Sequence, residues 1–152
     1  MDNIDARLLQ IIQADASSTN ESIGELVGLS PMAVWRRIKR LEEEGVIKKR
    51  VALLDAKKLG RPITAFVMLR TQQHSTAWFK RLQEAVVGMP EVMEFHRLSG
   101  EIDFMLKVSL RDIEDYQSFY KKLTSQVELM DVSTSFAFEQ VKCTHELPIC
   151  SI

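Results

Sequence analysis

Residues 21–40, ESIGELVGLSPMAVWRRIKR, constrain the fold of this chain more than any other segment. A short amphipathic helix leads to a tight turn at Gly28-Leu29, and Ser30-Pro31 then supplies the N-cap and the first position of a second helix. That second helix carries four cations within five residues, which are Arg36, Arg37, Lys39 and Arg40. Two helices joined by a short turn containing glycine are typical of a helix-turn-helix, whose second helix enters the major groove of DNA.

The preceding residues supply the rest of a small helical core. Apolar residues at 4, 8, 11 and 12 follow the spacing of an amphipathic helix over residues 3–15, with Asp2 as its predicted cap. Ser18 with Glu21 fits a capping box for the next helix. Gly24 lies inside that helix at a propensity cost of about 1 kcal/mol, which indicates close helix crossing rather than a ligand site.

The helix after Ser30 can be divided into faces at about 100° per residue. Val34, Ile38 and Leu41 share the inward face, and the cations lie on the other side. The predicted DNA-binding residues are Ser30, Met32, Ala33, Arg36, Arg37, Lys39 and Arg40. Among them Met32, Ala33 and Arg36 are assigned to base edges, and Lys39 and Arg40 to phosphates. Arg37 fits an ion pair inside the domain equally well, and Trp35 is expected to pack at the flank of the apolar face.

The charge distribution agrees with a local DNA-binding surface. The whole chain of 152 residues has a formal net charge of -1, which argues against a general polyanion binder. Residues 30–58, however, hold nine Lys or Arg against four acidic residues. Phosphate contacts supply affinity and orientation, so a basic segment at the motif is what groove binding requires.

The rest of the chain predicts a second domain of the α+β class. Residues 1–50 form the predicted helix-turn-helix domain, 51–62 a hinge strand and linker, and 63–152 the second domain. Apolar patterns predict strands at 63–70, 92–98, 103–109 and 132–141, with helices near 78–89 and 113–127. The order β-α-β-β-α-β is that of a ferredoxin-like fold.

That order places both helices on one face of an antiparallel sheet. Too many large apolar side chains remain for the helix-covered side alone, namely those of Phe66, Met68, Phe104, Leu106, Phe136 and Phe138. The simplest cover for the second face is another copy of the same sheet, which predicts a homodimer.

Motifs along the whole chain together resemble the Lrp/AsnC family of transcriptional regulators. They include Ile4-Asp5 with Leu8-Leu9, residues 27–31, 36–42, 45–47 and 52–55, the SGEID turn at 99–103, and EQVK at 139–142. The resemblance implies a winged helix-turn-helix joined to an amino-acid-sensing domain that forms dimers, commonly assembling into tetramers or octamers. It also implies a small effector, usually an amino acid, bound between dimers and controlling assembly or DNA binding.

In such regulators the effector lies against the turn that corresponds here to residues 100–103. Gly100 can adopt a positive φ and expose amide groups to a carboxylate, and Asp103 offers an anion to an α-ammonium group. A plain hairpin in which Asp103 is an internal hydrogen-bond acceptor is the alternative from the residues alone. The effector residues that the resemblance implies are Leu98, Gly100, Ile102, Asp103, Asp112, Ser133, Thr134 and Ser135.

The resemblance leaves the effector open among leucine, methionine and cysteine. Ile102 stands where the family often has an aromatic residue, and the apolar neighbourhood that it forms with Leu98 and Met130 favours a neutral side chain.

Other chemistry has little support in the sequence. Cys143, His145 and Cys150 lack the spacing of a zinc site, so no metal or other cofactor is expected and a thiol role for the cysteines stays open. No nucleophile–base pattern or phosphate loop is present, so we expect no enzyme. No run of 18 apolar residues and no signal peptide are found, which predicts a cytoplasmic protein without a membrane partner. The alternative function is a stand-alone amino-acid-sensing regulatory subunit of a metabolic enzyme.

Overall fold

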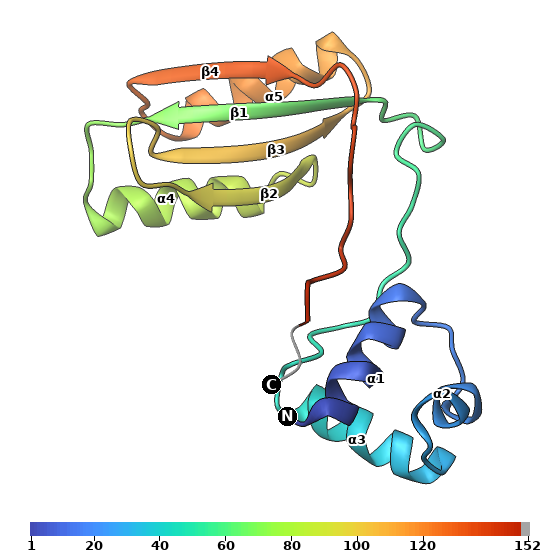
Figure 1. Ribbon diagram of the computed structural model, residues 1–152. Coiled ribbons are helices and arrows are strands. Elements are labelled where there is room, and N and C mark those ends of the chain that lie inside the picture. The colour runs from blue at the N-terminus through green and yellow to red at the C-terminus, as the bar shows by residue number, and fades with distance from the viewer. Residues whose placement is uncertain (150–152) are drawn as a thin grey trace. The chain divides into compact units, whose positions relative to one another are not determined.

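The computed structural model describes residues 1–149 and divides the chain into two compact units. The N-terminal unit comprises residues 1–53 together with the tail that follows Gln140, and the second unit comprises residues 54–140. Figure 1 labels the elements of both units. The predicted sensing domain, 63–152, includes this tail, whereas in the structure the tail packs within the N-terminal unit.

Three helices form the N-terminal unit, and local sequence explains where each begins. Helix α1 spans Asn3–Ala14, α2 spans Asn20–Val27, and α3 spans Pro31–Glu43. Asp2 caps α1 as predicted, but α2 is capped by Thr19 rather than Ser18. Gly28 ends α2 at φ 70°, a left-handed conformation that a residue without a Cβ adopts at little cost, and the chain turns directly into α3.

The core of this unit comes from the apolar stripes of all three helices. Its fully or nearly fully buried members are Leu8, Ile12, Ile23, Val34 and Ile38. Gly24 is buried beside the turn, where a Cβ on it would lie 2.5 Å from the backbone oxygen of Leu29. The glycine therefore has a structural role, but it permits close approach of the following turn rather than the predicted helix crossing.

The tail is attached to α1 mainly through Gln13. The Gln13 side chain donates from Nε2 to the Leu147 backbone oxygen at 2.8 Å and accepts from the Leu147 N–H at 3.0 Å. Gln10 adds a longer bond of 3.4 Å to the backbone oxygen of Ile149. This glutamine provides the donor and the acceptor that a neighbouring strand would provide, so the tail is held without a sheet.

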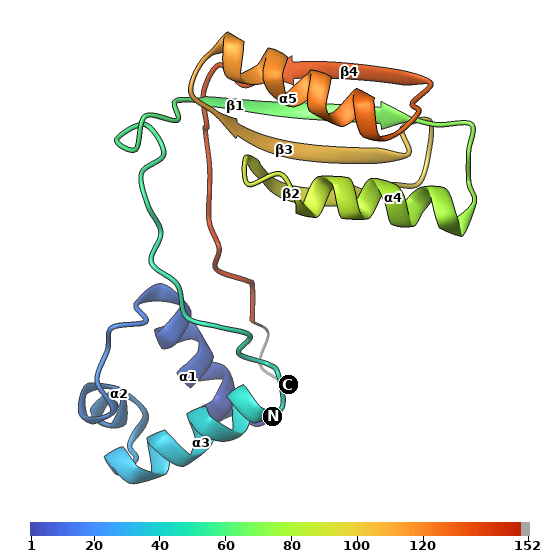
Figure 2. The same cartoon turned by 180° about the vertical axis from the view of Figure 1, so that it is seen from behind.

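The second unit is a four-stranded antiparallel sheet covered on one face by two helices. Along the chain follow β1 (Ile63–Arg70), α4 (Thr76–Val87), β2 (Val92–Arg97), β3 (Phe104–Leu110), α5 (Ile113–Gln126) and β4 (Asp131–Phe136). The strand order is β2-β3-β1-β4, which is the predicted ferredoxin-like arrangement. Figure 2 shows α4 and α5 on the same side of the sheet.

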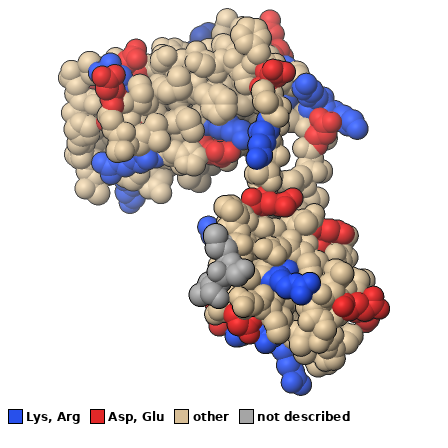
Figure 3. Space-filling view, viewed as in Figure 1, with Lys and Arg blue, Asp and Glu red and all other residues tan. Residues whose placement is uncertain are grey.

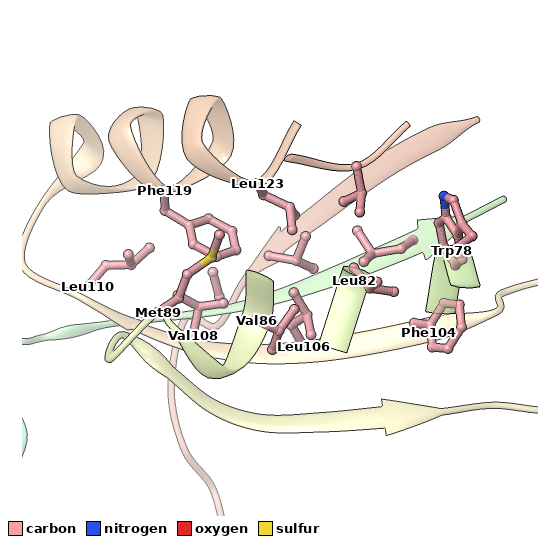
Figure 4. Packing of buried hydrophobic residues seen from close by; sticks show 14 residues of the cluster. Trp78, Leu82, Val86, Met89, Phe104, Leu106, Val108, Leu110, Phe119 and Leu123 are labelled. Carbon is pink, nitrogen blue, oxygen red and sulfur yellow. The ribbon is translucent and has the colours of Figure 1, made fainter. Parts of the chain in front are cut away.

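The buried core of this unit lies between the sheet and the two helices. Trp78 and Leu82 of α4 and Phe119 and Leu123 of α5 point toward the strands in Figure 4. The Trp78 indole N–H donates to the backbone oxygen of Glu128 at 3.1 Å, so its polar atom is satisfied within the core. Burial of these large side chains is the main stabilising contribution to the unit.

Strand register shows which apolar residues lie on the uncovered face. Phe104 and Leu106 are 4% and 0% exposed and belong to the helix-covered core. Phe136 is also on that side, since it pairs with Ala65 and its ring lies edge-on to Tyr116, with the centroids 5.2 Å apart. The uncovered face instead carries Phe66, Met68 and Met105 at its centre, with Lys107, Glu94, His96, Ser133 and Ser135 around them.

Two predicted strands differ from the structure. Residues 51–54 form no strand, and Leu53 and Leu54 are exposed, because no other segment of the described chain pairs with them. The last strand ends at Phe136 rather than at residue 141. The Ala137 N–H still bonds to the Thr64 oxygen at 2.9 Å, but β1 begins at Ile63 and offers no partner further along.

Candidate functional site

Helix α3 presents one polar, exposed face. Ser30 caps it, its hydroxyl accepting from the Ala33 N–H at 3.3 Å, and Ala33 itself is half-buried. Met32 is 57% exposed and Trp35 is 46% exposed, so the expectation that Trp35 packs at the flank is wrong. Arg36 is exposed near the middle of this face, and no hydrogen bond or ion pair joins its side chain to another residue within 1–149.

The remaining cations of α3 divide between two flanks of the helix. On one flank, Lys39 lies 5.1 Å from the centroid of the Trp35 ring and 3.9 Å from Glu43. On the other flank, Arg37 and Arg40 turn toward α1. On the face drawn in Figure 3, acidic side chains are interspersed with Lys and Arg on this unit.

Two carboxylates of α1 hold the arginines of the second flank. Arg37 Nη1 lies 2.8 Å from Asp2 Oδ2 and 2.8 Å from Asp5 Oδ1. Arg40 Nη2 lies 2.7 Å from Asp5 Oδ2. Arg37 thus makes an ion pair inside the domain, which was one of its two predicted roles. Arg40 was assigned to phosphates from the sequence, but its side chain also binds Asp5 within the unit. No local sequence pattern indicates either aspartate as a partner of these arginines, because the pairs are 32 to 35 residues apart in the chain.

This environment keeps both carboxylates ionised. The backbone N–H of Asp5 and the Arg37 guanidinium lower the pKa of Asp2 to about 2. Burial opposes ionisation of Asp5, but the N–H of Asp2 and the guanidinium groups of Arg37 and Arg40 outweigh it and lower the pKa of Asp5. The pKa of Arg37 is raised in turn by hydrogen bonds to Asp2 and Asp5.

The second candidate site is the turn between β2 and β3. The Leu98 N–H donates to the Asp103 backbone oxygen at 2.8 Å and closes the hairpin. Gly100 has φ 128°, as predicted, and both Leu98 and Gly100 are exposed, whereas Ile102 is half-buried. An L residue rarely adopts this φ, so the turn geometry depends on glycine.

Asp103 has a structural partner within the unit. Its Oδ2 accepts from the Thr71 N–H at 2.8 Å, and its own N–H donates to the Leu69 oxygen at 3.1 Å. The carboxylate therefore fixes the loop that follows β1, so it is a structural acceptor, but for a segment outside the hairpin rather than within it. It is half-buried, and none of the hydrogen bonds within residues 1–149 uses its Oδ1.

The structure does not bring all predicted effector residues together. Asp103 precedes β3 and Asp112 follows it, and a seven-residue strand separates such positions by roughly 20 Å. Asp112 instead caps α5, accepting from the Asp115 N–H at 2.7 Å. Ser133 and Ser135 are on the uncovered sheet face, whereas Thr134 is on the helix side, 2.8 Å from the Tyr116 hydroxyl.

A shallow hollow of about 190 Å³ lies at the Asp103 end of the sheet, and no sequence pattern indicated it. Arg97 lies over the Phe79 ring, 5.6 Å from its centroid, at one wall of this hollow. The lining residues are Gln73, His74, Thr76, Trp78, Phe79, Arg97 and Phe104. It therefore combines polar groups with an aromatic floor beside the β2–β3 turn.

Cys143 is exposed, with its Sγ 4.0 Å from His145 Nε2. Cys150 lies outside the described residues. Within residues 1–149, no three His, Cys, Asp or Glu side chains are grouped as metal ligands, and no helix has the length and apolar character needed to cross a membrane.

Comparison with known proteins agrees with this arrangement. Residues 1–48 match the winged helix-turn-helix DNA-binding family, and residues 64–147 match the Lrp/AsnC ligand binding domain. The chain is 43% identical over 150 residues to the DNA-binding transcriptional activator DecR of Escherichia coli K12, covering 98% of this chain and 99% of that protein.

Solved structures show the same similarity. An AsnC family transcriptional regulator from Agrobacterium tumefaciens is 47% identical with a TM-score of 0.93, each chain covered to 97%. A transcriptional regulator from Neisseria meningitidis in complex with L-methionine is 29% identical with a TM-score of 0.92, covering 97% of this chain and 96% of that one. The chain belongs to the Lrp/AsnC family and is a DNA-binding transcriptional regulator.

Proposed function

We propose that this regulator reads DNA through the exposed face of α3 and responds to a neutral amino acid bound at the β2–β3 turn. We further propose that it acts as a homodimer assembled through the uncovered sheet face, with tetramers or octamers built from such dimers. The observation that carries the DNA-binding part is Arg36, which is exposed at the centre of a capped helix and has no bond to the described chain. A free guanidinium at that place is suited to a guanine edge.

The residues near Arg36 divide into base-reading and phosphate-binding candidates. Met32 and Ala33 are in the first turn of α3, the part of a recognition helix that normally reaches base edges. Lys39 is one turn further along, and its ammonium group beside Trp35 is available to a phosphate. Ser30, Arg37 and Arg40 have partners within the unit, so we give them supporting roles.

Replacing Arg36 with alanine is expected to weaken specific binding by about 1–3 kcal/mol, the contribution of one good base contact. Binding is measured by fluorescence anisotropy on duplexes that the native protein selects from a random pool, and again on an unselected duplex. The loss on selected duplexes should exceed the loss on the unselected one, since a base contact carries sequence information.

Arg81→Ala is the matched control, because it removes an exposed arginine from α4 in the other unit. It should leave both affinities near the native values. Unchanged affinity of Arg36→Ala for selected duplexes would remove Arg36 from the interface.

The proposed effector site combines an anion, open backbone amides and apolar neighbours. Asp103 and Met130 both attach to the end of β1, since their N–H groups bond to the oxygens of Leu69 and Arg70. Leu98 and Met130 are exposed at this end of the sheet and could contact an apolar side chain. The L-methionine complex of the Neisseria meningitidis regulator supports this ligand class, and leucine, methionine and cysteine are the candidates.

A thermal-shift screen of the twenty amino acids tests the sensing role, and two isosteric variants test its place. Asp103→Asn keeps an acceptor for the Thr71 N–H but removes the charge that an α-ammonium group needs. The amino acid that raises the melting temperature of the native protein should no longer raise that of Asp103→Asn. Asp112→Asn removes the same charge at the other end of β3 and keeps a good helix cap, so its shift should persist. The reverse pattern would move the site to the α5 end of the sheet.

A stand-alone regulatory subunit of a metabolic enzyme explains the observations less well. Such a subunit would need the sensing domain alone. The capped, cationic α3 and its match to a DNA-binding family then have no role.

A further inference from the structure

One charged group lies in the otherwise apolar interior of the N-terminal unit. The Asp5 side chain is 1% exposed, and its two oxygens are fully engaged. Oδ1 accepts from Arg37 Nη1, and Oδ2 accepts from Arg40 Nη2 and from the Asp2 N–H at 2.9 Å. A single carboxylate on α1 therefore binds two successive cations on one flank of α3.

Stability alone is a weak reason for this arrangement. Burying a carboxylate has a large desolvation cost, and apolar residues of similar volume often replace a buried ion pair without loss of stability. Its distinctive effect here is on direction: Arg37 and Arg40 are drawn toward α1 while Arg36 and Lys39 are left on the outer face. Arg40 has one further acidic neighbour, Glu44, at 3.9 Å.

The direction of these cations matters for DNA recognition. Phosphate contacts add affinity for every sequence, whereas base contacts add affinity for the correct one. A helix whose four cations all bound phosphate would bind any duplex well and discriminate poorly. Holding two of them within the protein lowers sequence-independent affinity and gives base contacts a larger share of the total.

We propose that Asp5 is a specificity-determining positioning residue, which withholds Arg37 and Arg40 from DNA phosphates by binding them against α1. The proposal rests on the DNA-facing role proposed for α3. Asp5 does not touch DNA. It acts through the two guanidinium groups and through the orientation of α3 on α1.

Asp5→Asn tests this directly, because it removes the charge and keeps the shape. We expect tighter binding to an unselected duplex and a smaller ratio of specific to non-specific affinity. The plot of log K against log salt should become steeper by about 0.9 for each guanidinium released to a phosphate, so by up to about 1.8 per recognition helix.

Asp15→Asn is the charge-matched control. Asp15 is the exposed C-cap residue of α1, and its carboxylate accepts from Ser17. The variant adds the same unit of positive charge to the unit without releasing an arginine, so its salt slope should stay native. If the salt slope steepens equally in Asp5→Asn and Asp15→Asn, the change in net charge alone explains the effect, and the proposal is overturned.

Arg40→Ala in the native background gives a second, independent test. Arg37 still engages Asp5 in this variant, and the salt slope should be unchanged because Arg40 is not a phosphate contact. In the Asp5→Asn background the same substitution should lower the steepened slope by about 0.9. A shallower slope for Arg40→Ala alone would show that Arg40 binds phosphate in the native protein, and the proposal would fail.

Two further variants separate the possible failures. Circular dichroism melting checks that Asp5→Asn is folded, and Asp5→Glu, which restores the charge, should restore much of the native specificity ratio. If Asp5→Asn does not fold, the Arg40→Ala measurement decides alone. If Arg36→Ala also leaves specific affinity unchanged, the role of α3 has failed, and with it the basis of this proposal.

Discussion

Replacing Gly24 with alanine is expected to destabilise the N-terminal unit by several kcal/mol and abolish DNA binding. In an exposed helix the same change would add about 1 kcal/mol of stability through helix propensity. Here the new Cβ would lie 2.5 Å from the Leu29 oxygen, and that oxygen belongs to the backbone of the turn. The Leu29 N–H also bonds to the Gly24 oxygen at 3.0 Å, so the turn and α2 cannot separate without losing that contact.

The size of this effect follows from the small size of the unit. Overpacking usually costs about 1–3 kcal/mol, and a backbone atom relaxes less readily than a side chain. A helical unit formed largely by residues 1–53 has a total stability of about 3–8 kcal/mol at the usual contribution per residue. The clash therefore removes a large share of that stability, and α3 loses its fixed orientation.

Hydrogen exchange measured segment by segment gives the clearest readout. Protection should fall in α2 and α3 and stay native in β1 and β3, which belong to the other unit. Gly88→Ala is the control, because the nearest atom to a Cβ there is the Ala85 oxygen, at an ordinary 3.5 Å. Native protection of α2 in Gly24→Ala would contradict the close approach of the turn.

Replacing Met68 with aspartate is expected to convert the proposed homodimer into monomers. Met68 is at the centre of the uncovered sheet face, paired with Met105 on β3 and Ser133 on β4. If a second copy covers this face, each interface would bury two new carboxylates without a cationic partner opposite. We expect at least a hundredfold rise in the dissociation constant, or about 3 kcal/mol, since burying an unpaired charge costs several kcal/mol.

Sedimentation velocity measures this outcome, and Val87→Asp provides the comparison. Val87 is exposed on α4, on the opposite side of the sheet, and receives the same new charge. If Met68→Asp sediments with the mass of the native assembly and Val87→Asp sediments as a monomer, the dimer contact lies on the helix side of the sheet. A monomeric Met68→Asp protein should also lose affinity for paired half-sites, because only a dimer places two recognition helices on one duplex.

Local sequence was enough to predict most of the secondary structure. The caps at Asp2 and Ser30, the turn at Gly28 and the positive φ of Gly100 are all as predicted. These features depend on residues within about four positions, where backbone geometry and side-chain length limit the choices. The order of strands and helices in the second unit follows from hydrophobic periodicity for the same reason.

Strand ends and strand faces were predicted less well. Residues 51–54 have a β-type sequence but pair with no other segment of residues 1–149, and a strand is defined by its partner. Phe104 and Leu106 had no assigned face until the register with β1 placed them beneath α4 and α5. The separation of Asp103 from Asp112 also follows from the length and direction of β3, which lies between them. The identity of the polar residues alone did not indicate this distance.

The sequence by itself determined the family, the two kinds of domain and the capped, cationic helix that we propose faces DNA, because each is encoded in short, periodic patterns. Only the tertiary structure decided which cations on that helix are available. Asp5 reaches Arg37 and Arg40 across 32 and 35 residues of chain. Such a pair forms only when packing of α1 against α3 brings the groups within hydrogen-bonding distance. Four neighbouring cations that look equivalent in the sequence thus become two that are bound by Asp5 and two that are not.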